Sequence, residues 1–146
     1  MSRLERKVGI ITGAVRGIGR ATAERFCAEG ASLVIVDIDG EGVERTASEI
    51  ADKGGRVVGQ KCDVSDAASC GAAVKRAVDE FGKLNILMNN AAYFIGQNTV
   101  EEVDIAEWRR AVDVNLTGPM LMSKYSIPAM RDAGGGSIIH VASQLG

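Results

Sequence analysis

An apolar run that leads through three closely spaced glycines into a helix constrains the fold of this chain more than any other feature. Residues 8–12 read Val-Gly-Ile-Ile-Thr, and the glycines are Gly13, Gly17 and Gly19. A short apolar run of this kind is typical of a strand buried on both faces of a parallel sheet. The glycines allow a tight turn, a close approach to a ligand and close packing of the following helix. The unpaired N–H groups at the start of that helix suit a pyrophosphate.

An acidic residue at a characteristic distance strengthens this interpretation. The glycine spacing G-x-x-x-G-x-G, taken alone, also fits a plain strand–turn–helix with glycine punctuation. However, the next apolar run, residues 33–36, ends in Asp37, which lies 18 residues after Gly19. A dinucleotide-binding fold places an acid about 20 residues after the glycines, where it accepts hydrogen bonds from the adenosine ribose. The pattern therefore predicts a dinucleotide site that includes Asp37.

Strand and helix patterns alternate along the whole chain without a linker or a low-complexity segment. After the first strand, the predicted strands are 33–36, 56–61, 84–88 and 137–142. This alternation predicts an α/β fold, with helices on both faces of a doubly wound, Rossmann-type parallel sheet in the strand order 3-2-1-4-5. Residues 1–146 then form one dinucleotide-binding domain. Its ligand should lie at the carboxyl ends of strands one and four, where the order reverses.

The helices are predicted from apolar periodicity and from residues that begin or end helices. The second helix should begin near Asp39, and the third should run from an N-cap at Ser65 to Gly82. A long helix should follow from about 104 to 130, with Pro128 ending or kinking it. The positions expected on its buried face are Trp108, Val112 and Leu116.

Charge and composition exclude several classes of function. The net charge of −2 and the 25% of charged residues provide no clustered basic excess for binding nucleic acid. The sequence has no charged–apolar–small leader and no apolar stretch near the roughly 20 residues that span a membrane. We therefore expect a cytoplasmic protein with neither a nucleic-acid nor a membrane partner.

The cysteines and the histidine are interpreted as packing residues. Cys27, Cys62 and Cys70 are odd in number and form no C-x-x-C motif, which is typical of thiols in a reducing compartment. The single histidine, His140, lies in the last predicted strand, so we expect it near the core and not as a catalytic base. With one histidine, no metal site is expected.

Five motifs occur in the order in which one enzyme family has them. They are Thr12-Gly13-x-x-x-Gly17-x-Gly19, Asp63 after the third strand, Asn89-Asn90-Ala91 after the fourth, Asn115 in Val-Asn-Leu-Thr-Gly, and Ser143 after the fifth. With these motifs the chain resembles the short-chain dehydrogenase/reductase family over essentially its whole length. Ala92 departs from the family, which usually has a glycine there. The segments Asn-Asn-Ala-Ala-Tyr-Phe and Val-Ala-Ser-Gln-Leu-Gly are similar to the family's sugar-alcohol (sorbitol-type) dehydrogenases.

The resemblance implies an oxidoreductase that transfers a hydride between NAD and a secondary alcohol or ketone, such as a polyol. The implied cofactor-binding residues are Gly13, Arg16, Gly17, Ile18, Gly19, Asp37, Asp63, Val64, Asn90 and Ala91. The glycine loop would line the pyrophosphate, and Asp63 would accept a hydrogen bond from the adenine amine beside Val64. Asn90 and Ala91 would face the nicotinamide ribose. Two alternatives stay open: Asp63 also fits an ordinary strand exit, and Asn90 a polar turn.

The resemblance also implies two residues of the catalytic machinery. Asn115 would occupy a helix irregularity and hold a water of the proton relay, and Ser143 would donate a hydrogen bond to the substrate oxygen. The family's base is a tyrosine in Tyr-x-x-x-Lys on the next helix, but neither Tyr93 nor Tyr125 has a lysine four positions later. We therefore expect the chain to be truncated at its carboxyl-terminal side, without the final strands, helices and substrate loop, and to be inactive alone.

Two residues give opposite indications about the cofactor. Asp37 favours NAD, because a carboxylate repels the 2′-phosphate of NADP at short range. Arg16 points toward NADP, but its flexible side chain can turn to solvent. NAD is therefore the expected cofactor, and NADP the alternative.

Two other functions are compatible with parts of the pattern. The chain could be a catalytically inactive half-domain that binds a cofactor or a partner. A Rossmann-like methyltransferase would explain the glycine loop but not Asn90, Asn115 and Ser143 together. Besides a small-molecule substrate, the expected partner is a second copy of the chain or the missing carboxyl-terminal half. Either would cover the fifth strand and apolar groups among Leu116, Met120, Met122 and Ile127.

Overall fold

A computed structural model describes residues 2–96 and 99–143 and contains a five-stranded sheet. The strands are β1 (Val8–Thr12), β2 (Ser32–Asp37), β3 (Arg56–Lys61), β4 (Ile86–Asn89) and β5 (Ser137–His140). Their order is β3-β2-β1-β4-β5, and all four pairings are parallel. The predicted α/β class and strand order are confirmed. The strand ends shift slightly, since β4 begins later than predicted and β5 ends at residue 140.

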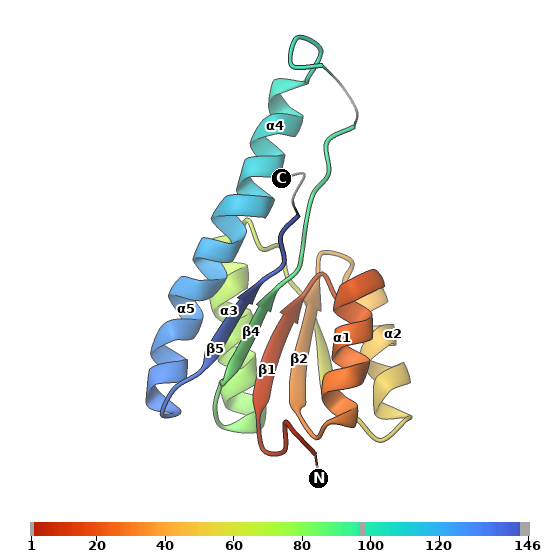
Figure 1. Cartoon of the computed structure of the whole chain (residues 1–146), viewed down its shortest axis with the longest axis vertical. Coiled ribbons are helices and arrows are strands. Elements are labelled where there is room, and N and C mark those ends of the chain that lie inside the picture. Colours follow the sequence, from red (N-terminus) through yellow and green to blue (C-terminus); the bar gives the residue numbers. More distant parts are fainter. Residues whose placement is uncertain (1, 97–98, 144–146) are drawn as a thin grey trace.

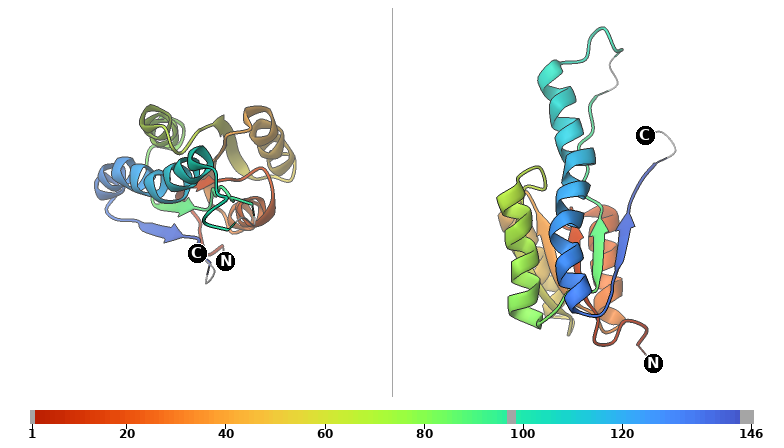
Figure 2. Two further views of the ribbon diagram at one scale, coloured as in Figure 1. Left: turned by 90° about the horizontal axis from the view of Figure 1, so that it is seen from above. Right: turned by 90° about the vertical axis from the view of Figure 1, so that its left-hand side faces the viewer.

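Helices cover both faces of this sheet, as Figures 1 and 2 show. The helices are α1 (Gly17–Ala28), α2 (Gly40–Ala51), α3 (Ala67–Phe81), α4 (Ile105–Val112) and α5 (Gly118–Asp132), with a π-helical segment η1 (Asp113–Thr117) joining the last two. One buried cluster lies between the sheet and α1 and α2, and a second lies between the sheet and α3 and α5. Within the described parts of the chain, no helix is long and apolar enough to cross a membrane.

The central strands are buried on both faces because alternate side chains enter different clusters. In β1, Ile10 packs in the cluster with α3 and α5, whereas Ile11 packs in the cluster with α1 and α2. In β2, Val34 and Ile35 divide in the same way. This two-sided burial explains why these strands read as nearly continuous apolar runs in the sequence.

The prediction of the α3 N-cap was wrong by one residue. The carboxylate of Asp66, not the hydroxyl of Ser65, caps the helix by accepting a hydrogen bond from Ser69 N at 2.7 Å. The Ser65 hydroxyl instead donates to Asp63 Oδ1 at 2.6 Å. The predicted end at Gly82 is confirmed, since Gly82 takes φ = 80° and closes the helix.

Of the two outcomes predicted for Pro128, an end or a kink, the structure excludes the first, because Pro128 lies inside α5 and the helix continues past it. The helix continues to Asp132 because Met122, Ser126 and Met130 are buried on both sides of the proline. A single missing hydrogen bond near the end of a packed helix is tolerated when tertiary contacts hold both flanks. The irregularity of the long helix is the π-helical segment η1, not a break at the proline.

The predicted buried face of the long helix was also wrong. Trp108 and Leu116 are 56% and 69% exposed and Val112 is half-buried, whereas the buried side chains include Val114, Met122 and Met130. The reason is visible in Figure 1: α4 extends past the carboxyl ends of the strands, so no sheet lies beneath it. Periodicity identifies an apolar stripe along the helix, but it does not show whether another element packs against that stripe.

Two further expectations concern the last strand and its surroundings. The edge expected at β5 is present, since among the described residues β5 pairs only with β4. His140 is exposed rather than near the core, because it is the last residue of this edge strand, although it lies on the same face as the half-buried Ile138. Of the apolar groups expected to be uncovered on the long helix, Met122 is instead fully buried.

Candidate functional site

The glycine loop between β1 and α1 takes a conformation that other residues would not tolerate. Gly13 and Gly17 have φ values of 65° and 60°, in the left-handed region. A Cβ on Gly13 would lie 2.8 Å from the Cα of Ala91, and one on Gly19 would lie 2.3 Å from the carbonyl oxygen of Gly13. In contrast, no atom lies within 4 Å of a Cβ built on Gly17. The loop is therefore packed on the protein at Gly13 and Gly19, and open to a ligand at Gly17.

The amino end of α1 has no capping side chain of its own. Its N-cap residue is Arg16, which makes no side-chain capping bond, and its first turn contains no acidic residue. The corresponding residues of α2 and α3 are Asp39 and Asp66, and both accept a hydrogen bond from a backbone N–H of their helix. Arg16 and Ile18 are exposed beside this end. The N–H groups and the positive end of the α1 dipole thus remain available to an anion.

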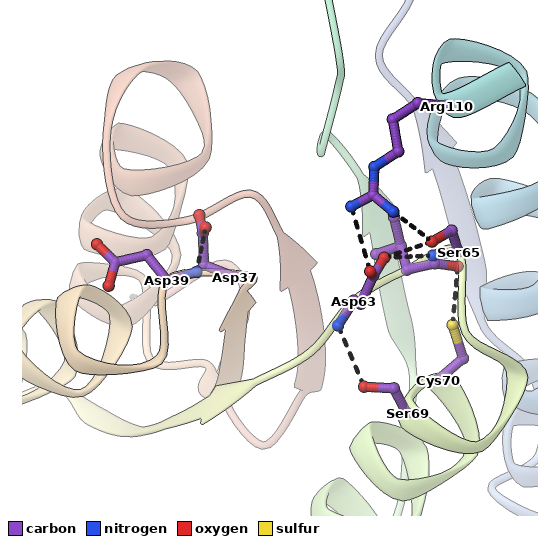
Figure 3. A network of polar contacts seen from close by, with 8 residues as sticks. Asp37, Asp39, Asp63, Ser65, Ser69, Cys70 and Arg110 are labelled. Carbon is purple, nitrogen blue, oxygen red and sulfur yellow. Dashed lines mark hydrogen bonds and ion pairs between the residues drawn. The ribbon is translucent and has the colours of Figure 1, made fainter. Parts of the chain in front are cut away.

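Asp37 lies at the carboxyl end of β2, beside the glycine loop. Its Oδ2 accepts a hydrogen bond from Val15 N at 3.2 Å, and its Oδ1 accepts one from Asp39 N at 3.2 Å. The carboxylate therefore orders two loops at this edge, as Figure 3 shows for the contact with Asp39. A carboxylate has about four acceptor positions, so these two bonds leave it able to accept more.

Thr12 joins β1 to the segment after β4, a role that the sequence interpretation missed. Its buried hydroxyl accepts hydrogen bonds from Asn90 N and Ala91 N, both at 2.9 Å. The side-chain amide of Asn90 in turn donates to the carbonyl oxygens of Thr12 and Gly13, both at 3.0 Å. These bonds fix Asn90 and Ala91 at the point where the strand order reverses.

Asp63, after β3, lies in a polar network that includes a residue not identified from the sequence (Figure 3). Its Oδ1 accepts from the backbone N–H and hydroxyl of Ser65, at 3.0 and 2.6 Å. Its Oδ2 accepts from Arg110 Nη2 at 3.2 Å, and Arg110 Nη1 donates to Ser65 Oγ at 3.2 Å. Burial alone would raise the pKa of Asp63, but the hydrogen bonds from Ser65 and Arg110 outweigh it and hold that pKa below its ordinary value.

Asn115 lies in the π-helical segment and binds the backbone of Tyr93. Asn115 Oδ1 accepts from Tyr93 N, and Asn115 Nδ2 donates to Tyr93 O, both at 2.8 Å. The Tyr93 hydroxyl donates to Glu107 Oε1 at 3.1 Å, and this carboxylate raises the pKa of Tyr93. The irregularity that the family resemblance implied at Asn115 is thus present, and it fixes the loop after β4 against the long helix.

The remaining predicted residues lie around the same edge. Val64 is buried, and its carbonyl oxygen accepts a hydrogen bond from Cys70 Sγ at 3.2 Å. Ser143 is exposed beyond the end of β5. Tyr125 packs against the core and against Gly71, away from this edge. In residues 2–96 and 99–143, no group of three or more His, Cys, Asp or Glu side chains is placed to hold a metal ion.

The carboxyl edge of the sheet therefore brings together the glycine loop, Asp37, Asp63 and Asn90, which are dispersed along the sequence. The signals that could have found the missed residues are weak. A threonine that ends a buried strand before a glycine points to Thr12, but no local pattern relates Arg110 to Asp63, 47 positions away. The arrangement can hold an extended ligand that has an anionic centre at α1 and a nucleobase near Asp63.

Comparisons with known proteins identify relatives along nearly the entire chain. The family model described as short chain dehydrogenase matches residues 7–146. The chain is 38% identical over 145 residues to cyclohexanol dehydrogenase of Acinetobacter sp. (strain SE19), covering 99% of the chain and 58% of that protein. It is 43% identical to galactitol 2-dehydrogenase of Agrobacterium fabrum (strain C58 / ATCC 33970), covering 99% and 55%. It is 39% identical to D-threitol dehydrogenase of Mycolicibacterium smegmatis (strain ATCC 700084 / mc(2)155), covering 97% and 54%. The chain spans about half the length of these curated relatives.

Proposed function

The chain belongs to the short-chain dehydrogenase family, and we propose that the whole protein transfers a hydride between NAD and a secondary alcohol or ketone. The observation that carries the proposal is the uncapped amino end of α1, which opens from the glycine loop beside Asp37. A helix end that lacks its own carboxylate suits the pyrophosphate of a dinucleotide. Since the chain spans about half the length of its relatives, the activity is proposed for the whole protein.

The residues at the carboxyl edge fit such a cofactor. The open space at Gly17 would admit the pyrophosphate, with Gly13, Gly19, Ile18 and Arg16 around it. The bound cofactor would supply the hydride acceptor or donor. Asp63 and Val64 would bind the adenine, while Asn90 and Ala91, fixed by the Thr12 hydroxyl, would place backbone groups against the nicotinamide ribose.

NAD is the proposed cofactor because of the position of Asp37. Its carboxylate lies beside the glycine loop through its bond to Val15 N, where the adenosine ribose would bind. The 2′-phosphate of NADP would come close to this negative charge, and the repulsion is strongest at short range. Arg16 is exposed and is the residue that would favour NADP if it turned toward the phosphate.

On the catalytic side, Ser143 would donate a hydrogen bond to the substrate oxygen, and Asn115 would hold a water of the proton relay. The two bonds between Asn115 and Tyr93 keep this helix segment against the loop after β4. The tyrosine–lysine pair of the family does not occur in the 146 residues, so the chain alone is proposed to be inactive. Its relatives are named for cyclohexanol, galactitol and threitol, and we propose a cyclic or polyhydric secondary alcohol as substrate.

The proposed setting is a homo-oligomeric, cytoplasmic protein. The apolar side chains of Ile105, Trp108, Leu116, Met120 and Ile127 are exposed along α4, η1 and α5. Exposed apolar side chains gathered along one helical segment are typical of an interaction site, which a second copy of the protein would cover. Sedimentation of the whole protein as a stable monomer at micromolar concentration would contradict this assignment.

The test is a titration of the whole protein with NAD and with NADP, followed by turnover assays with cyclohexanol and galactitol. We expect tighter binding of NAD and a gain in NADP affinity in Asp37→Ala. Tighter NADP binding that is unaffected by Asp37→Ala would contradict the cofactor assignment and point to Arg16. Binding of either dinucleotide without turnover of any secondary alcohol would favour the inactive half-domain instead.

A further inference from the structure

Arg110 connects the long helix to the loop after β3. It lies on α4, and its guanidinium spans two acceptors at once: Nη2 donates to Asp63 Oδ2 and Nη1 donates to Ser65 Oγ, both at 3.2 Å. The Asp63 and Arg110 side chains are 32% and 36% exposed, so the pair lies at the surface of the site rather than in the core. Figure 3 shows the guanidinium reaching from its helix to both groups.

The hydrogen bonds that residues 2–96 and 99–143 make to the Asp63 carboxylate leave it one defined acceptor position. Each carboxylate oxygen has two lone pairs. Both positions on Oδ1 are used by the backbone N–H and the hydroxyl of Ser65. On Oδ2, Arg110 uses one position. The second position on Oδ2 can accept a hydrogen bond from a ligand, and its direction is fixed by the three bonds that hold the carboxylate.

The planar fork of arginine suits this task better than a point charge. A guanidinium presents two parallel N–H donors in a fixed geometry, so it orients the carboxylate as well as neutralising it. It also keeps the carboxylate ionised, since the bond from Arg110 contributes to the lowered pKa of Asp63. An ionised carboxylate only accepts hydrogen bonds, and therefore selects a ligand group that donates one.

We propose that Arg110 is a positioning residue that sets the base preference of the cofactor site, by aiming Asp63 Oδ2 at the exocyclic amine of an adenine. This inference rests on the proposed function, because it requires a dinucleotide in the site. Arg110 does not touch the cofactor. It acts through Asp63, and it also links recognition of the base to α4, which leads into the segment that carries Asn115.

The experiment compares three probes on the whole protein: NAD, nicotinamide hypoxanthine dinucleotide and nicotinamide mononucleotide. The second replaces the exocyclic amine of the adenine with a carbonyl, and the third lacks the adenosine half of the dinucleotide. Dissociation constants are measured by calorimetric titration for the wild type, Arg110→Met and Arg110→Lys. Arg109→Met is the matched control, because Arg109 is the adjacent arginine of the same helix and is exposed.

For the wild type and the control we expect NAD to bind about tenfold more tightly than the hypoxanthine analogue, as one hydrogen bond to a charged group provides. In Arg110→Met this ratio should fall to less than about threefold, and in Arg110→Lys to an intermediate value. Binding of nicotinamide mononucleotide should be unchanged, whereas a general disturbance of the fold would weaken all three probes.

The outcomes separate the two proposals. A wild type that binds no NAD overturns the proposed function and this inference with it. A wild type that binds NAD without a preference over the analogue, or an Arg110→Met variant that keeps the full preference, overturns the inference alone. If Arg110→Met does not fold, Arg110→Lys decides: a reduced ratio supports the role of the fork, and a wild-type ratio overturns it.

Discussion

The amino ends of α1 and α3 occupy equivalent places in the fold but differ in chemistry. Each helix follows a parallel strand and begins near the carboxyl edge of the sheet. At α3, Asp66 accepts a hydrogen bond from the first turn and so supplies the negative charge that a helix amino end favours. At α1 the equivalent residue is Arg16, whose side chain accepts no capping bond from the N–H groups of the first turn. The comparison teaches that α3 is capped by a side chain of its own chain, whereas α1 has no such cap, which is the feature that supports the anionic ligand proposed there.

The largest effect is expected where the backbone around α1 is most tightly packed. In Gly19→Ala the new Cβ would lie 2.3 Å from the Gly13 carbonyl oxygen, so the loop must move. We expect the free energy of unfolding to fall by roughly 1–3 kcal/mol. We also expect the protein to lose dinucleotide binding. Denaturant unfolding and NAD titration measure the two.

Gly17→Ala is the matched control for this change, since its Cβ would meet open space. Its positive φ still makes alanine unfavourable by roughly 1 kcal/mol, so it should destabilise the fold less than Gly19→Ala. Equal losses of stability in the two variants would contradict the distinction between a packed and an open glycine.

Arg16→Asp would give α1 the kind of cap that α3 has. The new carboxylate should raise the free energy of unfolding by about 0.5–1 kcal/mol and weaken NAD binding by at least about tenfold through repulsion of the pyrophosphate. Arg16→Asn separates the two effects, because it can cap without adding a charge. If Arg16→Asp stabilises the protein and leaves NAD affinity unchanged, the uncapped end of α1 is not the pyrophosphate site that we propose.

The reverse change removes the cap of α3. Asp66→Ala should lower the free energy of unfolding by about 1 kcal/mol, while NAD affinity should stay within about twofold, because the Asp66 carboxylate is already engaged as the helix cap. Asp66→Ser retains a capping oxygen and should recover most of the stability. A marked loss of NAD affinity in Asp66→Ala with the fold intact would show that α3 also takes part in binding.

The smallest effect concerns pH. The pKa of Asp63 is lowered in the folded protein, mainly by its bonds with Ser65 and Arg110 acting against burial. The resulting stabilisation is present above the ordinary aspartate pKa of about 3.9 and disappears as the pH falls through the lower folded pKa. Because the side chain is about one third exposed, the contribution should be small. Unfolding curves of wild type and Asp63→Asn should differ at pH 6 and converge below pH 4, and a constant difference would refute the assignment.

The fold was largely predictable because its central strands β1, β2 and β4 are buried on both faces. A strand such as β1, in which every residue is buried, has a run of apolar residues that can be recognised in the sequence. The choice between Ser65 and Asp66 as N-cap was not predictable, because both can cap a helix. The outcome depended on Asp63, which engages the Ser65 hydroxyl.

The site was only partly predictable. The glycines and Asp37 follow a characteristic spacing, which can be recognised in the sequence alone. Arg110 carries no such signal, since its contact with Asp63 depends on how α4 is placed over the loop after β3. The stripe of Trp108 and Leu116 was found by its period, but a period does not reveal whether sheet, solvent or another chain lies opposite.

The hydroxyl of Thr12 has a consequence for how the molecule should open. A single oxygen, on a residue that is 1% exposed, accepts hydrogen bonds from the backbone amides of Asn90 and Ala91, which are 78 and 79 positions distant in the chain. These amide protons can exchange with solvent only when β1 separates from the end of β4, which opens the centre of the sheet. Their protection in hydrogen exchange should therefore equal that of the slowest amides of the sheet, although both residues lie outside the strands. In Thr12→Val the same two amides should exchange orders of magnitude faster while the strand amides change less, so that a loop would lose the kinetic behaviour of the core.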